Sequence, residues 1–120
     1  MPAKIQIIFY SMYGHVYRLA ESIAEGARAV GGSDVLLLQI RETLPPEILD
    51  KMGATNAKQP WSHLPIADPM RLAEADAIIL GTPTRYGSAA AQMQSFLVAT
   101  GQLWAKGALI LRPRWIDIMQ

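Results

Sequence analysis

Residues 8–16 read IFYSMYGHV, and this stretch decides how the chain begins to fold. The near-continuous apolar run Ile5–Tyr10 before it is typical of a strand that is buried on both faces. Over His15–Val30, apolar residues recur every three or four positions, which predicts an amphipathic helix. A short loop with Ser11 and Gly14 therefore joins a strand to a helix. Because the first backbone N–H groups of a helix bind anions, we expect a phosphorylated ligand at this joint.

The rest of the chain repeats the alternation of strand and helix. Asp34–Ile40 and Ala75–Gly81 are two more apolar strands, and a second helix is predicted around Gln92–Thr100. The proline-rich segment between the second and third strands allows only short helical turns, near Glu47–Lys51 and Pro69–Glu74. Strands joined through helices by short connections form parallel βαβ units with right-handed crossovers.

These elements predict one α/β domain over residues 1–120, an open, doubly wound parallel sheet with strand order 2-1-3 and a partial fourth strand. In such sheets, ligands bind outside the carboxyl ends of the strands at the point where the winding direction reverses. That point lies between the first and third strands. The loops Ser11–His15 and Thr82–Ser88 follow these two strands, so we expect one crevice to collect both loops.

Composition excludes several classes of function. The 120 residues carry a formal net charge of +1, so no strong field is present to recruit nucleic acid or an anionic membrane. The chain has no cysteine, which excludes disulfides, thiolate metal sites and cysteine nucleophiles. His15 and His63 have no close acidic cluster, so no metal site is expected. No apolar run reaches the length of a membrane span, and we expect a soluble, cytoplasmic protein.

The first loop has two interpretations. Ser11 can donate its hydroxyl to a phosphate oxygen, while Gly14 lets the backbone approach closely and the N–H groups of Gly14, His15 and Val16 point from the helix start. Alternatively, Ser11 only caps the helix and Gly14 only makes the turn. The loop matches neither the nucleoside-triphosphate motif GxxxxGK[ST] nor the dinucleotide motif GxGxxG.

The second loop adds candidates at the same crevice. Arg85 offers a guanidinium to an anionic ring edge, and Tyr86 and Tyr13 offer flat faces to an aromatic ligand. The alternative is that these side chains are ordinary exposed loop residues. Trp104 is either a core residue or a further wall of the pocket.

Several longer motifs carry a resemblance to a known family. They are YSMYGHV, AEGA, ETLPP, DAIILGTPTRYG, QMQSFLVATGQLW and KGAL, in this order between about Lys4 and Leu109. Together they resemble the flavodoxin-like NAD(P)H:quinone oxidoreductases of the WrbA family. The resemblance implies a flavodoxin-like fold, FMN as cofactor, NAD(P)H as co-substrate, a quinone as electron acceptor and a homo-oligomer. The flavin would take a hydride from NAD(P)H and pass two electrons to the quinone, with no general acid or base evident.

The resemblance also implies roles for individual residues. The FMN phosphate would lie on the segment Ser11, Met12, Tyr13, Gly14, His15, Val16. Thr84, Arg85 and Tyr86 would lie beside the isoalloxazine ring. Tyr13 and Trp104 would contact the nicotinamide and quinone side of the site.

The end of the sequence departs from the family. Its members continue with a strand, a Gly-rich loop against the flavin, a His-bearing segment and a final helix, whereas this sequence reads ILRPRWIDIMQ after Leu109. Pro113, Arg112 and Arg114 stand where an apolar fourth strand is expected. A truncated or frame-shifted gene would give this pattern, as would an unusual natural short form, and we expect the C-terminally shortened domain to bind FMN weakly. The leading functional hypothesis is an FMN-dependent quinone reductase. The alternative functions are a flavodoxin-type one-electron carrier, which the near-neutral charge disfavours, and a non-enzymatic remnant.

Overall fold

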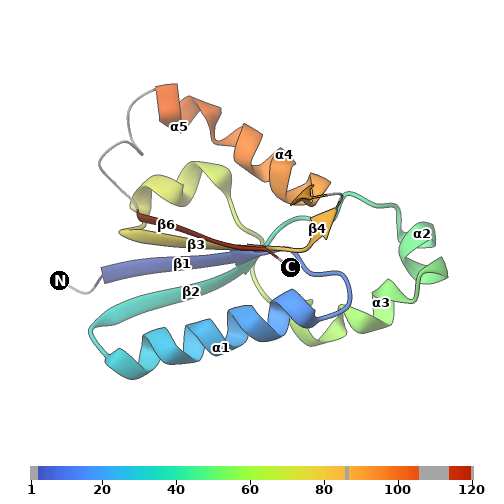
Figure 1. Ribbon diagram of the computed structural model, residues 1–120, viewed down its shortest axis with the longest axis horizontal. Helices are drawn as coiled ribbons and strands as arrows, with labels where there is room; N and C mark the ends of the chain where they lie inside the picture. Colours follow the sequence, from blue (N-terminus) through green and yellow to red (C-terminus); the bar gives the residue numbers. More distant parts are fainter. Residues whose placement is uncertain (1–2, 86, 106–113, 120) are drawn as a thin grey trace.

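The structure is a computed structural model that describes residues 3–85, 87–105 and 114–119, with the backbone alone described for Arg85, Gln102, Trp104 and 114–119. Figure 1 shows its elements along the chain. The strands are β1 (Ala3–Phe9), β2 (Ser33–Gln39), β3 (Ala77–Thr82), β4 (Thr84–Arg85), β5 (Ser88–Ala89) and β6 (Arg114–Met119). The α-helices are α1 (His15–Val30), α2 (Pro46–Lys51), α3 (Ala54–Ala57), α4 (Ala91–Ala99) and α5 (Gly101–Ala105), and the 3₁₀-helices are η1 (Gln59–Trp61) and η2 (Pro69–Glu74).

Four parallel strands form the main sheet in the order β2-β1-β3-β6. Ile5 of β1 lies opposite Val35 of β2 on one side and Ala77 of β3 on the other. The predicted order 2-1-3 and the α/β class are confirmed. Strands β4 and β5 form a separate antiparallel hairpin after β3.

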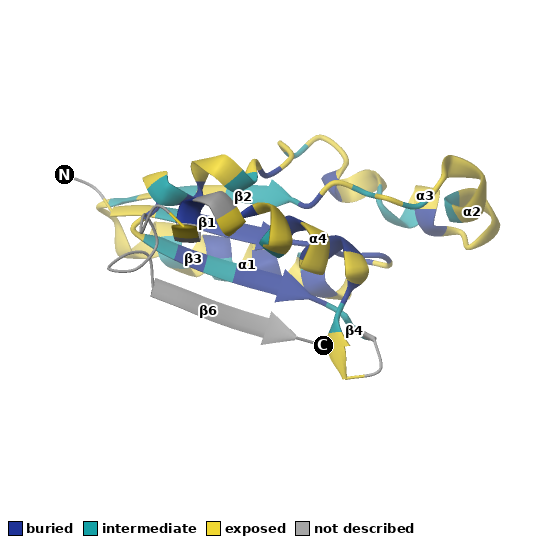
Figure 2. Ribbon diagram, turned by 90° about the horizontal axis from the view of Figure 1, so that it is seen from above, coloured by how far each residue is buried: buried dark blue, intermediate teal, exposed yellow. Residues whose placement is uncertain are grey.

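The two central strands are buried on both faces, as their apolar runs predict. Figure 1 shows α1 on one face of the sheet and η2, α4 and α5 on the other. Ile7 and Phe9 pack toward α1 with Val16, Ala20 and Ala24. The alternate positions of β1 and β3 pack on the opposite face with residues of η2 and α4: Ile8, Ile78, Leu80, Leu72, Met93, Phe96. Figure 2 shows this buried centre, with α2 and α3 beyond the end of the sheet, where α2 is mostly exposed and α3 is exposed in part.

The fourth strand lies slightly later than the sequence pattern indicates. Strand β6 begins at Arg114, and its residues pair in parallel with Ala77–Thr82 of β3. Pro113, which interrupts the apolar pattern, immediately precedes the strand. Because proline lacks a backbone donor, it is tolerated at the start of a strand better than inside it.

The proline-rich segment forms short helices, two of which are predicted. Helices α2 and η2 match the expected turns, while α3 and η1 were not predicted because they are too short to show helical periodicity. The hairpin β4–β5 and the short helix α5 were also missed. In the part of the chain that the structure describes, no helix combines the length and the hydrophobicity needed to cross a lipid bilayer.

Candidate functional site

Backbone hydrogen bonds join the carboxyl end of β1 to those of its two neighbours, β3 and β2. The Tyr10 N–H donates to the Gly81 carbonyl oxygen at 2.9 Å, and the Ile40 N–H donates to the Phe9 carbonyl oxygen at 2.8 Å. The chain segments that follow β1 and β3 therefore start side by side at the point where the winding direction of the sheet reverses. This is the position at which open α/β sheets bind ligands.

The β1–α1 segment (Ser11–Val16) presents the start of a helix to this edge. Gly14 is the N-cap residue, with φ 108° and ψ −7°, and no side chain in the described part of the chain caps the helix. The first backbone bond of α1 runs from the Arg18 N–H to the Gly14 carbonyl oxygen at 3.0 Å. The N–H groups of His15 and Val16 have no hydrogen-bond partner among the described residues. Such donors, together with the helix dipole, favour an anion.

Ser11 organises the turn rather than the helix. Its side chain is buried, with 2 % of its surface exposed, and its Oγ accepts a hydrogen bond from the Gly14 N–H at 3.1 Å. Ser11 therefore does not cap α1, and that part of the second interpretation is wrong, because the N-cap residue is Gly14, three positions later. The same bond engages the Gly14 N–H, so the expected donors reduce to those of His15 and Val16. The hydroxyl proton of Ser11 remains able to donate.

An aromatic cluster packs against the β1–α1 segment, and it was not predicted from the sequence. Trp61 is buried and stacks on Tyr17 of α1, with ring centroids 5.0 Å apart, and it meets Phe9 edge-on at 6.4 Å. A Cβ atom on Gly14 would lie 3.6 Å from Cζ3 of Trp61. The Gln39 side chain donates from Nε2 to the carbonyl oxygens of Trp61 at 3.1 Å and of Leu64 at 2.8 Å. These hydrogen bonds attach the Pro-rich segment to β2 and place Trp61 against the start of α1. We call this support the Trp61 floor.

A second glycine allows the helix start to approach β3. A Cβ atom on Gly81 would lie 3.0 Å from Cγ1 of Val16 and 3.5 Å from the Cβ of Phe9. The first distance is shorter than ordinary van der Waals contact. The absence of a side chain at Gly81 therefore sets how closely α1 packs against the end of β3.

The β3–α4 segment (Thr82–Ala90) is closed by a threonine. Thr82 is buried, its Oγ1 accepts from the Ala90 N–H at 3.1 Å, and its hydroxyl donates to the Pro83 carbonyl oxygen at 3.0 Å. Between these anchors the chain forms the hairpin β4–β5, in which Gly87 has φ 81°. Thr82 was not singled out from the sequence, and its position at the end of a buried strand is the only signal that it carries.

The remaining predicted site residues fall in different environments. Met12 and Val16 are buried in the core, while His15 is exposed. Tyr13 has 52 % of its surface exposed and donates from its hydroxyl to the Met52 carbonyl oxygen at 3.2 Å. Thr84 is half-buried in β4.

Three predictions concern residues that are described in part or not at all. Arg85 in β4 and Trp104 in α5 are placed by their backbone, and Tyr86 lies outside the described residues. The roles of these three side chains stay predictions.

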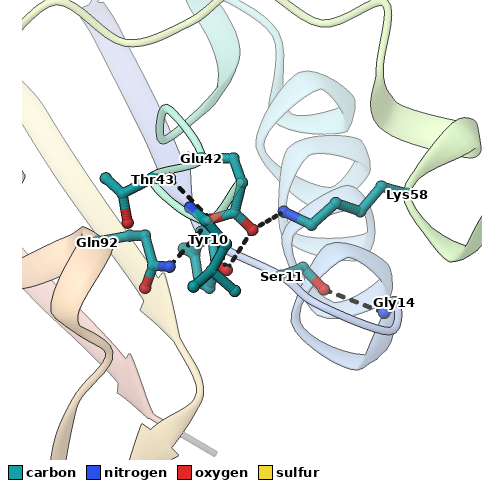
Figure 3. A network of polar contacts seen from close by, with 8 residues as sticks. Tyr10, Ser11, Gly14, Glu42, Thr43, Lys58 and Gln92 are labelled. Atoms are coloured by element: carbon teal, nitrogen blue, oxygen red, sulfur yellow. Dashed lines mark hydrogen bonds and ion pairs between the residues drawn. The ribbon is translucent and has the colours of Figure 1, made fainter. Parts of the chain in front are cut away.

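A carboxylate cluster joins the segments around this edge (Figure 3). We call it the Glu42 cluster, and it consists of Tyr10, Glu42, Thr43, Lys58 and Gln92. Burial raises the pKa of Glu42, but the Lys58 ammonium, the Tyr10 hydroxyl and the Thr43 N–H outweigh burial and hold this pKa below its ordinary value. Glu42 is therefore ionised at neutral pH. Its motif, ETLPP, contributed to the family resemblance, but nothing in the sequence indicated its partners.

The fold and the edge just described define a class. A parallel sheet of order β2-β1-β3-β6, with an uncapped helix start at the end of β1, is a flavodoxin-like α/β domain. Residues 7–111 match the family of NADPH-dependent FMN reductases, and the chain belongs to this family.

Curated relatives and solved structures agree with this assignment. The chain is 56 % identical over 107 residues to a protein of Aromatoleum aromaticum named NAD(P)H dehydrogenase (quinone), covering 89 % of this chain and 52 % of that protein. It is 55 % identical over 108 residues to a protein of the same name from Trichlorobacter lovleyi, covering 90 % and 53 %. The chain thus spans about half the length of the curated relatives it matches.

Solved structures share the architecture. The flavodoxin, WrbA-like protein of Agrobacterium tumefaciens has a TM-score of 0.57 and 28 % identity, over 88 % of this chain and 52 % of that chain. A flavoprotein of Lactobacillus acidophilus, solved in complex with FMN, has a TM-score of 0.52 and 17 % identity, over 98 % and 92 %. At that identity the second likeness shows the fold alone. The predicted flavodoxin-like fold is confirmed.

Proposed function

We propose that this chain binds FMN and takes part in the reduction of quinones by NAD(P)H. The family to which it belongs and the names of its relatives support this activity. Because the chain spans about half of those relatives, the proposal concerns the FMN-binding part of the site, which residues 11–16 and 84–86 would form. We also propose that the protein is cytoplasmic, as its composition indicates, and that it forms homo-oligomers, as the family resemblance implies.

One observation carries the proposal: the start of α1 is uncapped and opens at the switch point of the sheet. Gly14 holds a positive φ there, and the N–H groups of His15 and Val16 have no partner among the described residues. A phosphate group would satisfy both donors and oppose the positive end of the helix dipole. These residues fit the phosphate of FMN.

The chain's own residues would bind and orient the cofactor. The Ser11 hydroxyl would donate to a phosphate oxygen while its Oγ continues to hold the Gly14 N–H. The Trp61 floor would keep the helix start in place, since it packs directly against Tyr17 in the first turns of α1. When bound, FMN supplies the transfer of two electrons from NAD(P)H to a quinone.

The residues proposed to contact the isoalloxazine ring are taken from the family resemblance. Thr84, Arg85 and Tyr86 would lie beside the isoalloxazine, with Arg85 offering a positive charge near the ring. Tyr13 and Trp104 would line the space for the nicotinamide and the quinone. The 52 % exposure of Tyr13 leaves its ring open to such a contact.

A comparison of FMN with riboflavin tests phosphate binding by the β1–α1 segment, which we call the phosphate seat, because riboflavin has the same ring without the phosphate. We would titrate the purified chain with each and follow flavin fluorescence. Hydrogen bonds to charged groups contribute about 1.5–3 kcal/mol each, so we expect FMN to bind at least about tenfold tighter than riboflavin. Equal affinities would refute the phosphate seat.

The full-length relative of Aromatoleum aromaticum provides the reference for activity. Assayed beside this chain with NAD(P)H and a quinone, it measures how much of the affinity and turnover residues 1–120 supply. Retention of FMN binding without any quinone reduction would limit the function of this chain to cofactor binding.

A further inference from the structure

Five donors surround the Glu42 carboxylate, and the most distant of them is the Leu44 N–H at 3.5 Å from Oε2. Its Oε1 accepts from the Tyr10 hydroxyl at 2.7 Å and from Nζ of Lys58 at 2.9 Å. Its Oε2 accepts from the Thr43 N–H and from Nε2 of Gln92, both at 2.9 Å. Figure 3 shows these side chains converging on the carboxylate from separate segments. Because Tyr10, Lys58 and Gln92 come from distant parts of the chain, this carboxylate constrains their positions relative to one another.

Tyr10 and Gln92 belong to segments that border the proposed FMN site. Tyr10 directly precedes Ser11, and its backbone N–H also donates to the Gly81 carbonyl oxygen at the end of β3. Gln92 lies in the first turn of α4, two residues after Ala90, where the β3–α4 segment closes. Glu42 therefore connects the segment expected to bind the phosphate with the start of the helix that follows the segment expected to bind the ring.

Lys58 adds a link to the floor of the site. It follows α3 and precedes Trp61, which lies beneath Gly14. Its ammonium also lies 4.6 Å from the centroid of the Tyr10 ring, so it contacts both Glu42 and the aromatic face of Tyr10. The side chains of Lys58 and Glu42 are only 16 % and 18 % exposed. Because both side chains are largely shielded from water, removal of one charge costs more than it would in a fully exposed ion pair.

We propose that Glu42 is a positioning residue for the FMN site, holding the β1–α1 segment and the start of α4 in the arrangement that receives the phosphate and the ring together. This inference rests on the proposed function. Glu42 acts through Tyr10 and Gln92.

Glu42→Gln is the direct test, because it keeps the shape of the side chain and removes its charge. The Lys58 ammonium at Oε1 and the Thr43 N–H at Oε2 can only donate, so an amide NH₂ at this position faces one of them in either orientation. We expect Glu42→Gln to bind FMN about tenfold more weakly than the parent chain, at a temperature where both are folded. Glu74→Gln is the matched control, since Glu74 pairs with Arg71 at the surface, near the amino end of β3.

Two further variants separate positioning from general stability. Tyr10→Phe removes the link next to the β1–α1 segment, so it should lower the ratio of FMN to riboflavin affinity. Gln92→Met removes the link at α4, so it should weaken FMN and riboflavin by the same factor. Leu72→Ala removes a fully buried side chain of η2 and changes no member of the Glu42 cluster, so it should destabilise the fold and leave the FMN affinity of the folded chain unchanged. If Glu42→Gln does not fold, Tyr10→Phe and Gln92→Met provide the test.

The outcomes distinguish the two proposals. A parent chain that binds neither flavin refutes the proposed function, and the positioning role with it. A parent chain that binds FMN while Glu42→Gln binds it equally well overturns only the positioning role. A loss in Leu72→Ala as large as that in Glu42→Gln also overturns it, because affinity would then follow stability. Parent-like behaviour of both Tyr10→Phe and Gln92→Met is a further refutation.

Discussion

Gly14 and Gly26 offer a comparison within a single helix. Gly14 is the N-cap of α1 with φ 108°, whereas Gly26 lies inside α1, where an added Cβ atom would meet none of the described atoms outside the helix's own backbone within 4 Å. Replacing either residue with alanine reduces the freedom of the unfolded chain by a similar amount, which is worth about 0.4–1 kcal/mol of stability. Only Gly14→Ala also forces an L-residue into a disfavoured conformation.

The magnitude follows from the backbone rather than from a clash. A Cβ on Gly14 would lie 3.6 Å from Cζ3 of Trp61, which is ordinary contact. Backbone strain in such a region costs about 1–3 kcal/mol. Because the unfolded-state contribution is common to both variants, we expect Gly14→Ala to be less stable than Gly26→Ala by about 1–3 kcal/mol. Gly26→Ala itself should be more stable than the parent by about 0.5–1 kcal/mol.

Urea unfolding followed by tryptophan fluorescence measures both variants, and a flavin titration on the same samples measures binding. Gly26→Ala should bind FMN like the parent, whereas Gly14→Ala should bind it more weakly because the helix start has moved. Equal stability of the two variants would refute the argument from positive φ. A folded Gly14→Ala or Gly14→Val chain with the parent's FMN affinity would show that the phosphate seat is misplaced.

Three further outcomes are expected. Gly81→Ala should destabilise the chain by about 1–3 kcal/mol in urea unfolding, because its Cβ meets Cγ1 of Val16 at 3.0 Å. The double variant with Val16→Ala should lose less stability than the sum of the two single losses, and simple additivity would contradict the contact. Trp61→Ala should lower the free energy of unfolding by about 3–5 kcal/mol, since the ring is 2 % exposed; a loss below about 1 kcal/mol would show that the floor does not support the fold. The pKa of Glu42 is lowered in the folded chain, so its charge stabilises the fold above the ordinary glutamate pKa of about 4.3, and this contribution is lost as the pH falls through the folded pKa. The difference in free energy of unfolding between the parent and Glu42→Gln should therefore narrow from pH 6 to about pH 3. A constant difference would refute the lowered pKa.

Local patterns in the sequence are sufficient to predict the framework of this protein. The apolar runs of β1 and β3 indicate strands buried on both faces, and the spacing of apolar residues in α1 gives its bounds, His15–Val30, without error. Both signals depend on neighbours within one element, which is why a single sequence contains them. The joint at Ser11 and Gly14 is predictable for the same reason.

The tertiary structure alone decides what surrounds that joint. Glu42 meets Tyr10 across 32 positions and Gln92 across 50, and it lies in a proline-rich segment without any periodicity. Trp61 lies beneath Gly14 because distant residues hold its segment there, among them Gln39, which binds two of its carbonyl oxygens. The sequence also left open whether Ser11 caps the helix, and the positive φ of Gly14 decides this, because it places Ser11 outside the helix start. Such contacts depend on how the sheet brings distant residues together, and no local pattern encodes that distance.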